Sequence, residues 1–287
     1  MCCLLFLIDY DYSSLLKINV ALKYKYKKKV FSFWEPREKI PGYISLCIKT
    51  WKKNLPQYEI NILDYKGVKE YIGDELFNCI INKKMSLSIQ ADAIRVALLK
   101  KYGGIWMDAD TIITNEEFLK NMEKYELVMI GKNNMQHIGF IIASNNSIIL
   151  DKWLSEIINR VNKYRIINNK LENGTKRIVW NYLGNGIVDL LINLNITNKF
   201  FRLDKDQINA FPEITFFGNT SLSAYKRYNL FYFRKREPKI VLNNTKGIIM
   251  LHNSWTPLKY KRMSEIEFLK EDILLSRLLS MVLYISL

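Results

Sequence analysis

The feature that most constrains this 287-residue sequence is a block in which a helix pattern runs directly into a short apolar strand ending in two aspartates. The block is SLSIQADAIRVALLKKYGGIWMDADTIIT, residues 86–114. We predict a helix over 89–102, with Ser88 as its N-cap and Gly103 as the glycine that ends it. Gly104 then allows a turn into a strand at 105–107, which ends in Asp108-Ala109-Asp110. Any fold of this chain must therefore accommodate a mostly buried helix and strand that present two carboxylates at their end.

The same alternation of strand and helix patterns continues on both sides of the block. A β-branched and aromatic run at 30–34, an amphipathic helix from Pro41 to about Asn54 and an alternating strand at 59–63 give the order strand, helix, strand. This order implies a parallel sheet with a right-handed crossover. Further strands are expected at 127–131, 138–143 and 247–252, and further helices at 147–161 and 187–194. We therefore predict an α/β fold, a Rossmann-like and mostly parallel sheet flanked by helices, with a loop-rich region around residues 211–233.

Composition excludes several classes of protein. Hydrophobic residues make up 49% of the chain, which is too much for a disordered protein, and 12 Gly and 6 Pro are too few for a fibrous one. The four cysteines show no zinc-site spacing and favour a reducing compartment. The apolar run at 2–8 is too short to span a bilayer, so we expect a cytoplasmic protein. We divide the chain into a lead-in over 1–28, one domain over 29–262 and an apolar helical tail over 263–287.

The net charge of +15 is concentrated in residues 1–53 and 224–262, while the remainder is nearly balanced. An AT-rich genome would produce many Lys, Ile, Asn and Tyr residues without selection for charge, and we favour that interpretation for the run at 23–29. For the cluster at 224–262 we favour attraction to a polyanion, either a phosphorylated ligand or an anionic membrane. Because no nucleic-acid-binding motif is present, we expect no nucleic-acid partner.

The two aspartates predict a divalent metal site. Residues two apart in an extended segment point to the same side, so Asp108 and Asp110 can converge at the end of their strand. They lie between the apolar runs 105–107 and 111–113, where burying two uncompensated carboxylates would cost several kcal/mol. Mg²⁺ and Mn²⁺ take one or two carboxylates and fill their other positions with water and phosphate oxygens. We therefore interpret the two aspartates as ligands of a metal that bridges the protein and a diphosphate, and not as part of a solvated turn.

Asp92 and Arg95 are three residues apart and so share one face of the predicted helix. A surface ion pair between them would contribute under about 1 kcal/mol. The neighbouring positions are almost all apolar, which predicts a helix that is buried nearly all round. We therefore expect these two charges to face a ligand cleft.

The block carries a family resemblance. The pattern Ser88-x3-Asp92-x2-Arg95-x3-Leu99-x2-Tyr102-Gly103-Gly104-x-Trp106-x-Asp108-x-Asp110 resembles the signature of the DXD-containing sugar transferases of glycosyltransferase family 32, which includes capsular polysaccharide synthesis relatives. Residues 29–65 are similar to that family's opening, and HNSW at 252–255 is similar to its ending. Two departures are Trp106, where Tyr is common, and Gly184-Asn185-Gly186 in place of a Gly-Pro pair.

The resemblance implies a GT-A fold for residues 29–262 and transfer of a sugar from a nucleotide-sugar donor with retention of anomeric configuration. It implies that Asp108, Asp110 and His252 hold Mn²⁺ or Mg²⁺ and that Asp108 and His252 thereby contact the donor. It also implies that Asp92 and Arg95 act on the donor sugar, ribose or phosphate as the catalytic pair. We add two expectations for the donor: Trp34 stacks on the base, and Lys259 is one of several cations, with Arg234, Arg236 and Lys261, that can reach the diphosphate. His137 is interpreted as structural.

These inferences lead to a metal-dependent glycosyltransferase of bacterial capsular or surface polysaccharide synthesis. We expect the donor to be a UDP-sugar rather than a GDP-sugar. We expect the acceptor to be a lipid-linked saccharide, and the protein to contact the inner face of the plasma membrane peripherally. Two alternatives remain open. One is a glycosyltransferase that modifies a protein acceptor, and the other is a non-enzymatic basic protein that binds a polyanion or a membrane, which would leave the embedded carboxylates unexplained.

Overall fold

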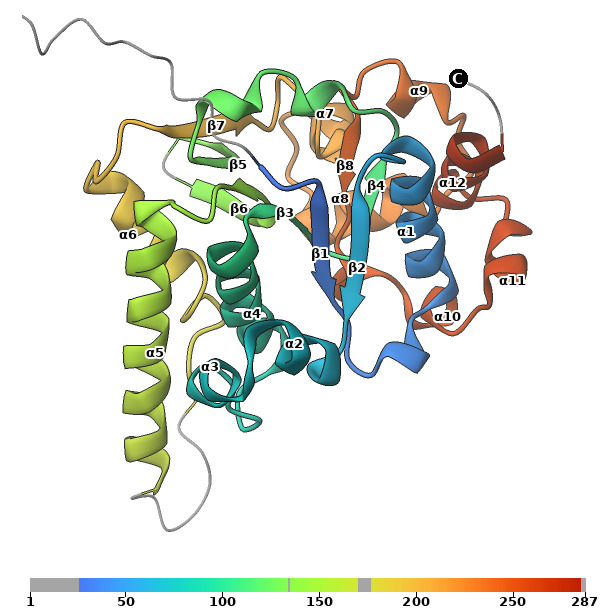
Figure 1. Ribbon diagram of the computed structural model, residues 1–287. Helices are drawn as coiled ribbons and strands as arrows, with labels where there is room; N and C mark the ends of the chain where they lie inside the picture. The colour runs from blue at the N-terminus through green and yellow to red at the C-terminus, as the bar shows by residue number, and fades with distance from the viewer. Residues whose placement is uncertain (1–25, 134, 170–176, 285–287) are drawn as a thin grey trace, which may run out of the picture.

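The computed structural model describes residues 26–133, 135–169 and 177–284. Its main sheet has six strands in the order β2-β1-β3-β6-β5-β7 (Figure 1). The strands are β1 Lys29–Phe33, β2 Glu59–Leu63, β3 Gly104–Met107, β5 Leu127–Lys132, β6 Met135–Ala143 and β7 Phe200–Asp204. Strand β6 runs against its neighbours β3 and β5, while the other three pairings are parallel. The predicted α/β fold with a mostly parallel sheet is therefore confirmed.

A second, two-stranded sheet pairs β4 Thr111–Ile113 with β8 Ile248–Met250 in antiparallel register. Strand β4 follows β3 after a short turn, and its pairing brings the segment after β8 next to the end of β3. Residues far apart in sequence thereby meet at one edge of the main sheet.

Helices cover both faces of the main sheet (Figure 1). The α-helices are α1 Gly42–Asn54, α2 Tyr65–Ile72, α3 Asp74–Ile80, α4 Leu87–Tyr102, α5 Ile148–Asn169, α6 Asn185–Asn193, α7 Pro212–Phe217, α8 Ala224–Tyr232, α9 Lys239–Leu242, α10 Leu258–Lys261, α11 Glu265–Leu269 and α12 Leu274–Tyr284. Successive strand residues face opposite sides, so Ile105 and Met107 join a core with α1, α8 and α12, whereas Trp106 joins a second core with α2 to α6. Period-two alternation in the strands thus separates two hydrophobic cores.

Most expected elements agree with the structure except at some ends, but the region around 211–233, expected to be loop-rich, contains helices α7 and α8. Helix α4 begins at Leu87 with Ser86 as N-cap, so Ser88 is inside the helix rather than its cap. Gly103 ends α4 with φ of 66°, a conformation that glycine adopts without strain. Strand β6 begins three residues earlier than predicted, and α5 extends past the predicted end at 161 to Asn169.

The predicted C-terminal tail packs into the body of the protein. Leu274, Leu275 and Leu278 of α12 are fully buried in the same core as Tyr43 of α1. The apolar pattern of α12 allowed either a packing helix or an interfacial one, and the structure shows the packing helix. The predicted lead-in lies outside the described residues apart from residues 26–28.

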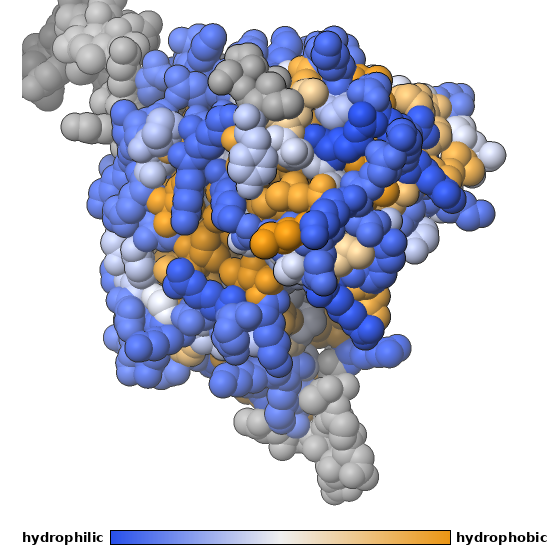
Figure 2. Space-filling model, turned by 90° about the vertical axis from the view of Figure 1, so that its right-hand side faces the viewer, coloured by the Kyte–Doolittle hydropathy of each residue, from blue (hydrophilic) through white to orange (hydrophobic). Residues whose placement is uncertain are grey.

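Figure 2 looks onto the side where α11 and α12 lie in Figure 1, and apolar side chains gather near the middle of a largely hydrophilic surface. Exposed apolar residues of the C-terminal elements include Leu258, Ile266 and Tyr284. No helix among the described residues combines the length and apolar character needed to cross a bilayer.

Candidate active site

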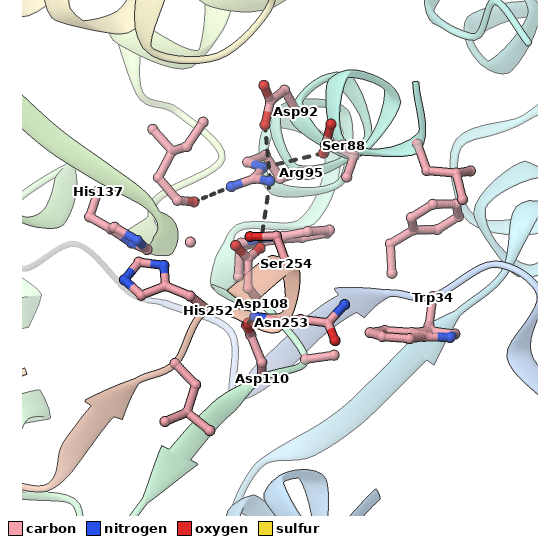
Figure 3. Close-up of a pocket in the computed structure, with 18 of the residues that line it drawn as sticks. Trp34, Ser88, Asp92, Arg95, Asp108, Asp110, His137, His252, Asn253 and Ser254 are labelled. Atoms are coloured by element: carbon pink, nitrogen blue, oxygen red, sulfur yellow. Dashed lines mark hydrogen bonds and ion pairs between the residues drawn. The ribbon is translucent and has the colours of Figure 1, made fainter. Parts of the chain in front are cut away.

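A cavity of about 920 Å³ opens where β1 and β3 end, at the carboxyl edge of the parallel part of the sheet. Ligands of open α/β sheets bind at this edge. The lining comes from the end of β1, from α4, from the turn after β3, from β6, from the start of α6 and from residues 251–255 (Figure 3). Six predicted site residues line it: Trp34, Asp92, Arg95, Asp108, Asp110 and His252.

The two aspartates lie in a tight turn between β3 and β4, and not in the extended segment expected from the sequence. The amide of Thr111 donates to the carbonyl of Asp108 at 3.0 Å, which closes the turn. The turn forms because β4 leaves the main sheet to pair with β8. Both residues line the same pocket, and the convergence of their carboxylates on one ion stays a prediction.

Arg95 ties two carboxylates together. Its Nη2 lies 3.0 Å from Oδ1 of Asp92 and 3.5 Å from Oδ1 of Asp108, and its Nη1 donates to the carbonyl of Ile138. The guanidinium also lies 5.0 Å from the ring centre of Trp106, whose Nε1 donates to Asp108 at 2.8 Å. Burial raises the pKa of the Asp92 carboxyl, with Arg95 opposing the shift and Asp108 adding to it. The pair predicted from helix spacing is therefore a buried network that orients Asp108.

Asp110 connects the turn to the segment after β8. Its Oδ2 accepts the amide of Asn253 at 2.6 Å, and the amide of Leu251 donates to its carbonyl at 3.3 Å. The Oδ1 of Asn253 in turn accepts the hydroxyl of Tyr43 at 2.5 Å. Burial, with a smaller contribution from the charge of Asp108, raises the pKa of the Asp110 carboxyl to about 7. Burial of Asp110 therefore disfavours its charged form in the absence of a cation.

His252 follows β8 and faces the same space. Its ring lies 4.0 Å from Trp255 and is stacked 5.8 Å from Phe211, centre to centre. Burial, with the neighbouring His137, lowers the pKa of the His252 imidazole to about 4. At neutral pH this ring is uncharged, so it can bind a metal or accept a hydrogen bond but cannot attract an anion by charge.

His137, interpreted from the sequence as structural, lies in the lining of the pocket. Its ring centre is 6.4 Å from that of His252, and its buried Nδ1 finds no hydrogen-bond partner among the described residues. A single histidine near the start of a mostly apolar strand carries no sequence signal for this placement. Only the pairing of β6 with β3 brings it beside Asp108.

A divalent metal fits this donor set. In the described part of the chain, no group of three or more His, Cys, Asp and Glu side chains is close enough to form a closed cage for an ion. The available donors are carboxylate oxygens of Asp108 and Asp110, and the neutral imidazole of His252 lines the same pocket. Mg²⁺ and Mn²⁺ need only one or two such carboxylates when a substrate phosphate completes their shell.

Two donor-binding expectations have different outcomes. Trp34 lines the pocket, and in Figure 3 it lies on the opposite side of Asp108 and Asp110 from His137. Lys259 does not line the pocket, because its ammonium lies 3.1 Å from the carboxylate of Glu271 and over the ring of Tyr260. None of the four cations considered lines the pocket, and Lys261 is the one whose charge lowers the pKa of Asp110, by a small amount compared with burial. That one of these cations reaches the diphosphate stays a prediction.

Fold and site define an α/β protein with an acidic, ligand-sized pocket at the carboxyl edge of its sheet. The chain belongs to the family of capsular polysaccharide synthesis proteins, whose model matches residues 12–186, more than half of the sequence. The capsular polysaccharide synthesis relationship expected from residues 88–110 is therefore confirmed. No functionally curated protein matches this sequence.

Three solved structures resemble the chain at low identity. The "PaToxG Glycosyltransferase" is 17% identical with a TM-score of 0.38, and the match covers 60% of this chain and 69% of that one. The glycosyltransferase GlyE of Streptococcus pneumoniae TIGR4 is 14% identical with a TM-score of 0.39, and the match covers 84% of this chain and 62% of that one. A glycosyltransferase involved in the glycosylation of the major capsid of PBCV-1 is 10% identical with a TM-score of 0.34, and the match covers 69% of this chain and 96% of that one. All three are named as glycosyltransferases.

Proposed function

We propose that this protein is a metal-dependent glycosyltransferase that moves a sugar from a nucleotide-diphosphate sugar, preferably a UDP-sugar, to a saccharide acceptor in capsular polysaccharide synthesis. The observation that carries the proposal is that Asp108, Asp110 and His252 line the same cavity as the Asp92–Arg95 pair. A volume of about 920 Å³ is enough for a nucleotide sugar. Family membership supports the same activity.

The charge and contacts of each pocket residue indicate its role in the proposed reaction. Asp108, Asp110 and His252 would hold Mn²⁺ or Mg²⁺, which supplies positive charge where the departing diphosphate becomes more negative. Arg95 is engaged by two carboxylates and a carbonyl, so it fixes Asp108 and Asp92 in position rather than moving to the substrate. Asp92 then presents its carboxylate to the hydroxyls of the donor sugar, and Trp34 offers an aromatic face to the base.

Donor binding tests the proposal directly. We expect UDP with Mn²⁺ to raise the melting temperature of the protein more than either component alone, and more than GDP with Mn²⁺. Asp108→Asn should abolish the joint effect while keeping the fold, since asparagine still accepts the Trp106 hydrogen bond. The matched control is Asp151→Asn, which removes an exposed aspartate paired with Lys100 outside the pocket. An unchanged response to UDP and Mn²⁺ in Asp108→Asn would contradict the proposal.

The acceptor and the site of action form the second part of the proposal. We infer a lipid-linked acceptor at the inner face of the membrane, with retention of configuration at the transferred sugar. The net charge of +15 and the exposed apolar residues Leu258, Ile266 and Tyr284 support peripheral contact with anionic lipid. Co-sedimentation with phosphatidylglycerol vesicles, absent with phosphatidylcholine vesicles, tests the contact. The anomeric configuration of the product, read by NMR, tests retention.

A further inference from the structure

A chain of hydrogen bonds runs from helix α1 to the pocket through Asn253, the residue after His252. The hydroxyl of Tyr43 donates to Oδ1 of Asn253 at 2.5 Å, and the main-chain amide of Asn253 donates to Oδ2 of Asp110 at 2.6 Å. Tyr43 is fully buried in α1, and its ring centre lies 5.7 Å from that of Phe268 in α11. Asn253 is therefore held beside Asp110 both by its backbone and by a side chain that is itself firmly packed.

The bond from Tyr43 fixes which end of the Asn253 amide is left for a ligand. A separation of 2.5 Å is within the range of O–H···O bonds and is shorter than bonds between nitrogen and oxygen, so the amide atom beside the hydroxyl is the oxygen. Asn253 is half-buried and lines the cavity, and its Nδ2 makes no hydrogen bond with any residue that the structure describes. Metal ions bind amides through oxygen, so this nitrogen can serve only a hydrogen-bond acceptor of a ligand.

The place of Asn253 in the pocket indicates which part of a nucleotide it meets. Figure 3 shows Asn253 on the same side of the two aspartates as Trp34, with His252 on the other side. In the proposed complex the base stacks on Trp34 and the diphosphate is held at Asp108 and Asp110, so the ribose that joins them passes Asn253. The carboxylate of Asp110 disfavours a second anion beside Asn253, so an uncharged ribose hydroxyl suits the Nδ2 donor better than a phosphate oxygen.

We propose that Asn253 is a nucleotide-binding residue that donates a hydrogen bond from Nδ2 to a ribose hydroxyl, and that Tyr43 is the positioning residue that orients its amide. Tyr43 does not line the cavity, so it acts on the nucleotide only through Asn253. The inference rests on the proposed glycosyltransferase function and adds a contact to the nucleotide in the same pocket.

Calorimetric titration of the full chain with UDP and with 2′,3′-dideoxy-UDP, each in the presence of Mn²⁺, tests the contact. The wild-type protein should bind UDP at least about fivefold more tightly than the dideoxy nucleotide. Asn253→Ala keeps the main-chain bond to Asp110 and removes the amide, so it should weaken UDP binding about fivefold and leave the dideoxy nucleotide unaffected. An equal loss for both nucleotides, or an unchanged UDP affinity, would overturn the assignment.

A double-mutant cycle tests the role of Tyr43. Tyr43→Phe removes only the hydroxyl and so releases the amide of Asn253, which should weaken UDP binding about threefold. In the Asn253→Ala background the same substitution should cause no further loss of UDP affinity. Additive losses would mean that Tyr43 acts by a route other than Asn253, and its positioning role would be wrong.

A matched pair outside the pocket provides the control. The hydroxyl of Tyr71 donates to Oδ1 of Asn61 at 2.6 Å, and neither residue lines the cavity. Tyr71→Phe and Asn61→Ala should therefore leave the affinity for UDP unchanged. No binding of UDP by the wild-type protein with Mn²⁺ would contradict the glycosyltransferase proposal together with this inference. Normal UDP binding that Asn253→Ala does not alter would overturn only the role of Asn253.

Discussion

Two parts of the pocket differ in whether their buried polar groups are hydrogen-bonded within the protein. On the carboxylate wall, formed by Asp108, Asp110 and His252, oxygens of both aspartates already accept hydrogen bonds from Trp106 and Asn253. Elsewhere in the pocket, the buried Nε2 of Gln136 and Nδ1 of His137 have no hydrogen-bond partner within the described part of the chain, and Trp180 is exposed. The carboxylate wall is therefore held in place by the protein's own hydrogen bonds.

The largest expected effect is on the carboxylate wall. Asp110→Asn removes one charge but keeps an oxygen for the amide of Asn253, so the fold should persist while sugar transfer falls about 10²- to 10³-fold. Steady-state transfer rates at saturating Mn²⁺ measure this. Transfer within about twofold of wild type would mean that Asp110 serves the fold and not sugar transfer.

A glycine beside Asp108 and His137 allows a more local test. A Cβ at Gly139 would lie 2.6 Å from Oδ2 of Asp108 and 3.0 Å from Nδ1 of His137. Gly139→Ala should therefore displace Asp108, destabilise the protein by about 1–3 kcal/mol and lower the affinity for Mn²⁺. Denaturant unfolding and isothermal titration calorimetry check the two effects. Gly67→Ala in α2, where the nearest atom is a leucine side chain at 3.1 Å, is the control that should be tolerated.

Three buried carboxyls, two inside the pocket and one outside, make the stability depend on pH. Burial raises the pKa of Asp92, Asp110 and Glu213 to about 7, above their values in an unfolded chain. The folded state then binds more protons, so each group lowers the free energy of unfolding as pH rises from about 4 to about 7. We expect Glu213→Gln to remove part of this slope and saturating Mn²⁺ to remove the part due to Asp110. Urea unfolding at about pH 5 and about pH 8 measures both. A slope insensitive to Mn²⁺ would place Asp110 outside the metal site.

The smallest expected effect separates two lysines near the carboxylate wall. Lys261→Ala should weaken UDP binding in the presence of Mn²⁺ by about fivefold, because its charge reaches Asp110. Lys259→Ala should leave UDP affinity unchanged, since its ammonium pairs with Glu271. Calorimetric titration with UDP distinguishes the two, and the opposite ranking would restore the original expectation for Lys259.

Much of the carboxylate wall could be predicted because its residues are close in sequence. The spacing of Asp92 and Arg95 on one helix, and of Asp108 and Asp110 after one strand, fixes their relative positions within a few residues of chain. A β-branched and aromatic run, an alternating run and an apolar run after two glycines likewise predicted β1, β2 and β3 nearly to the residue. The turn at 108–110 was not predicted, because it depends on β4 pairing with β8.

Sequence by itself thus determined which charges share an element and that the sheet is mostly parallel, since local spacing and apolar periodicity act over a few residues. Tertiary structure alone decided which distant residues meet. It placed His137 and Trp180 in the pocket, gave Lys261 rather than Lys259 an influence on Asp110, and packed α12 into the core of α1. These outcomes depend on strand order and on long-range packing, and such contacts leave no periodic trace in the sequence around each residue.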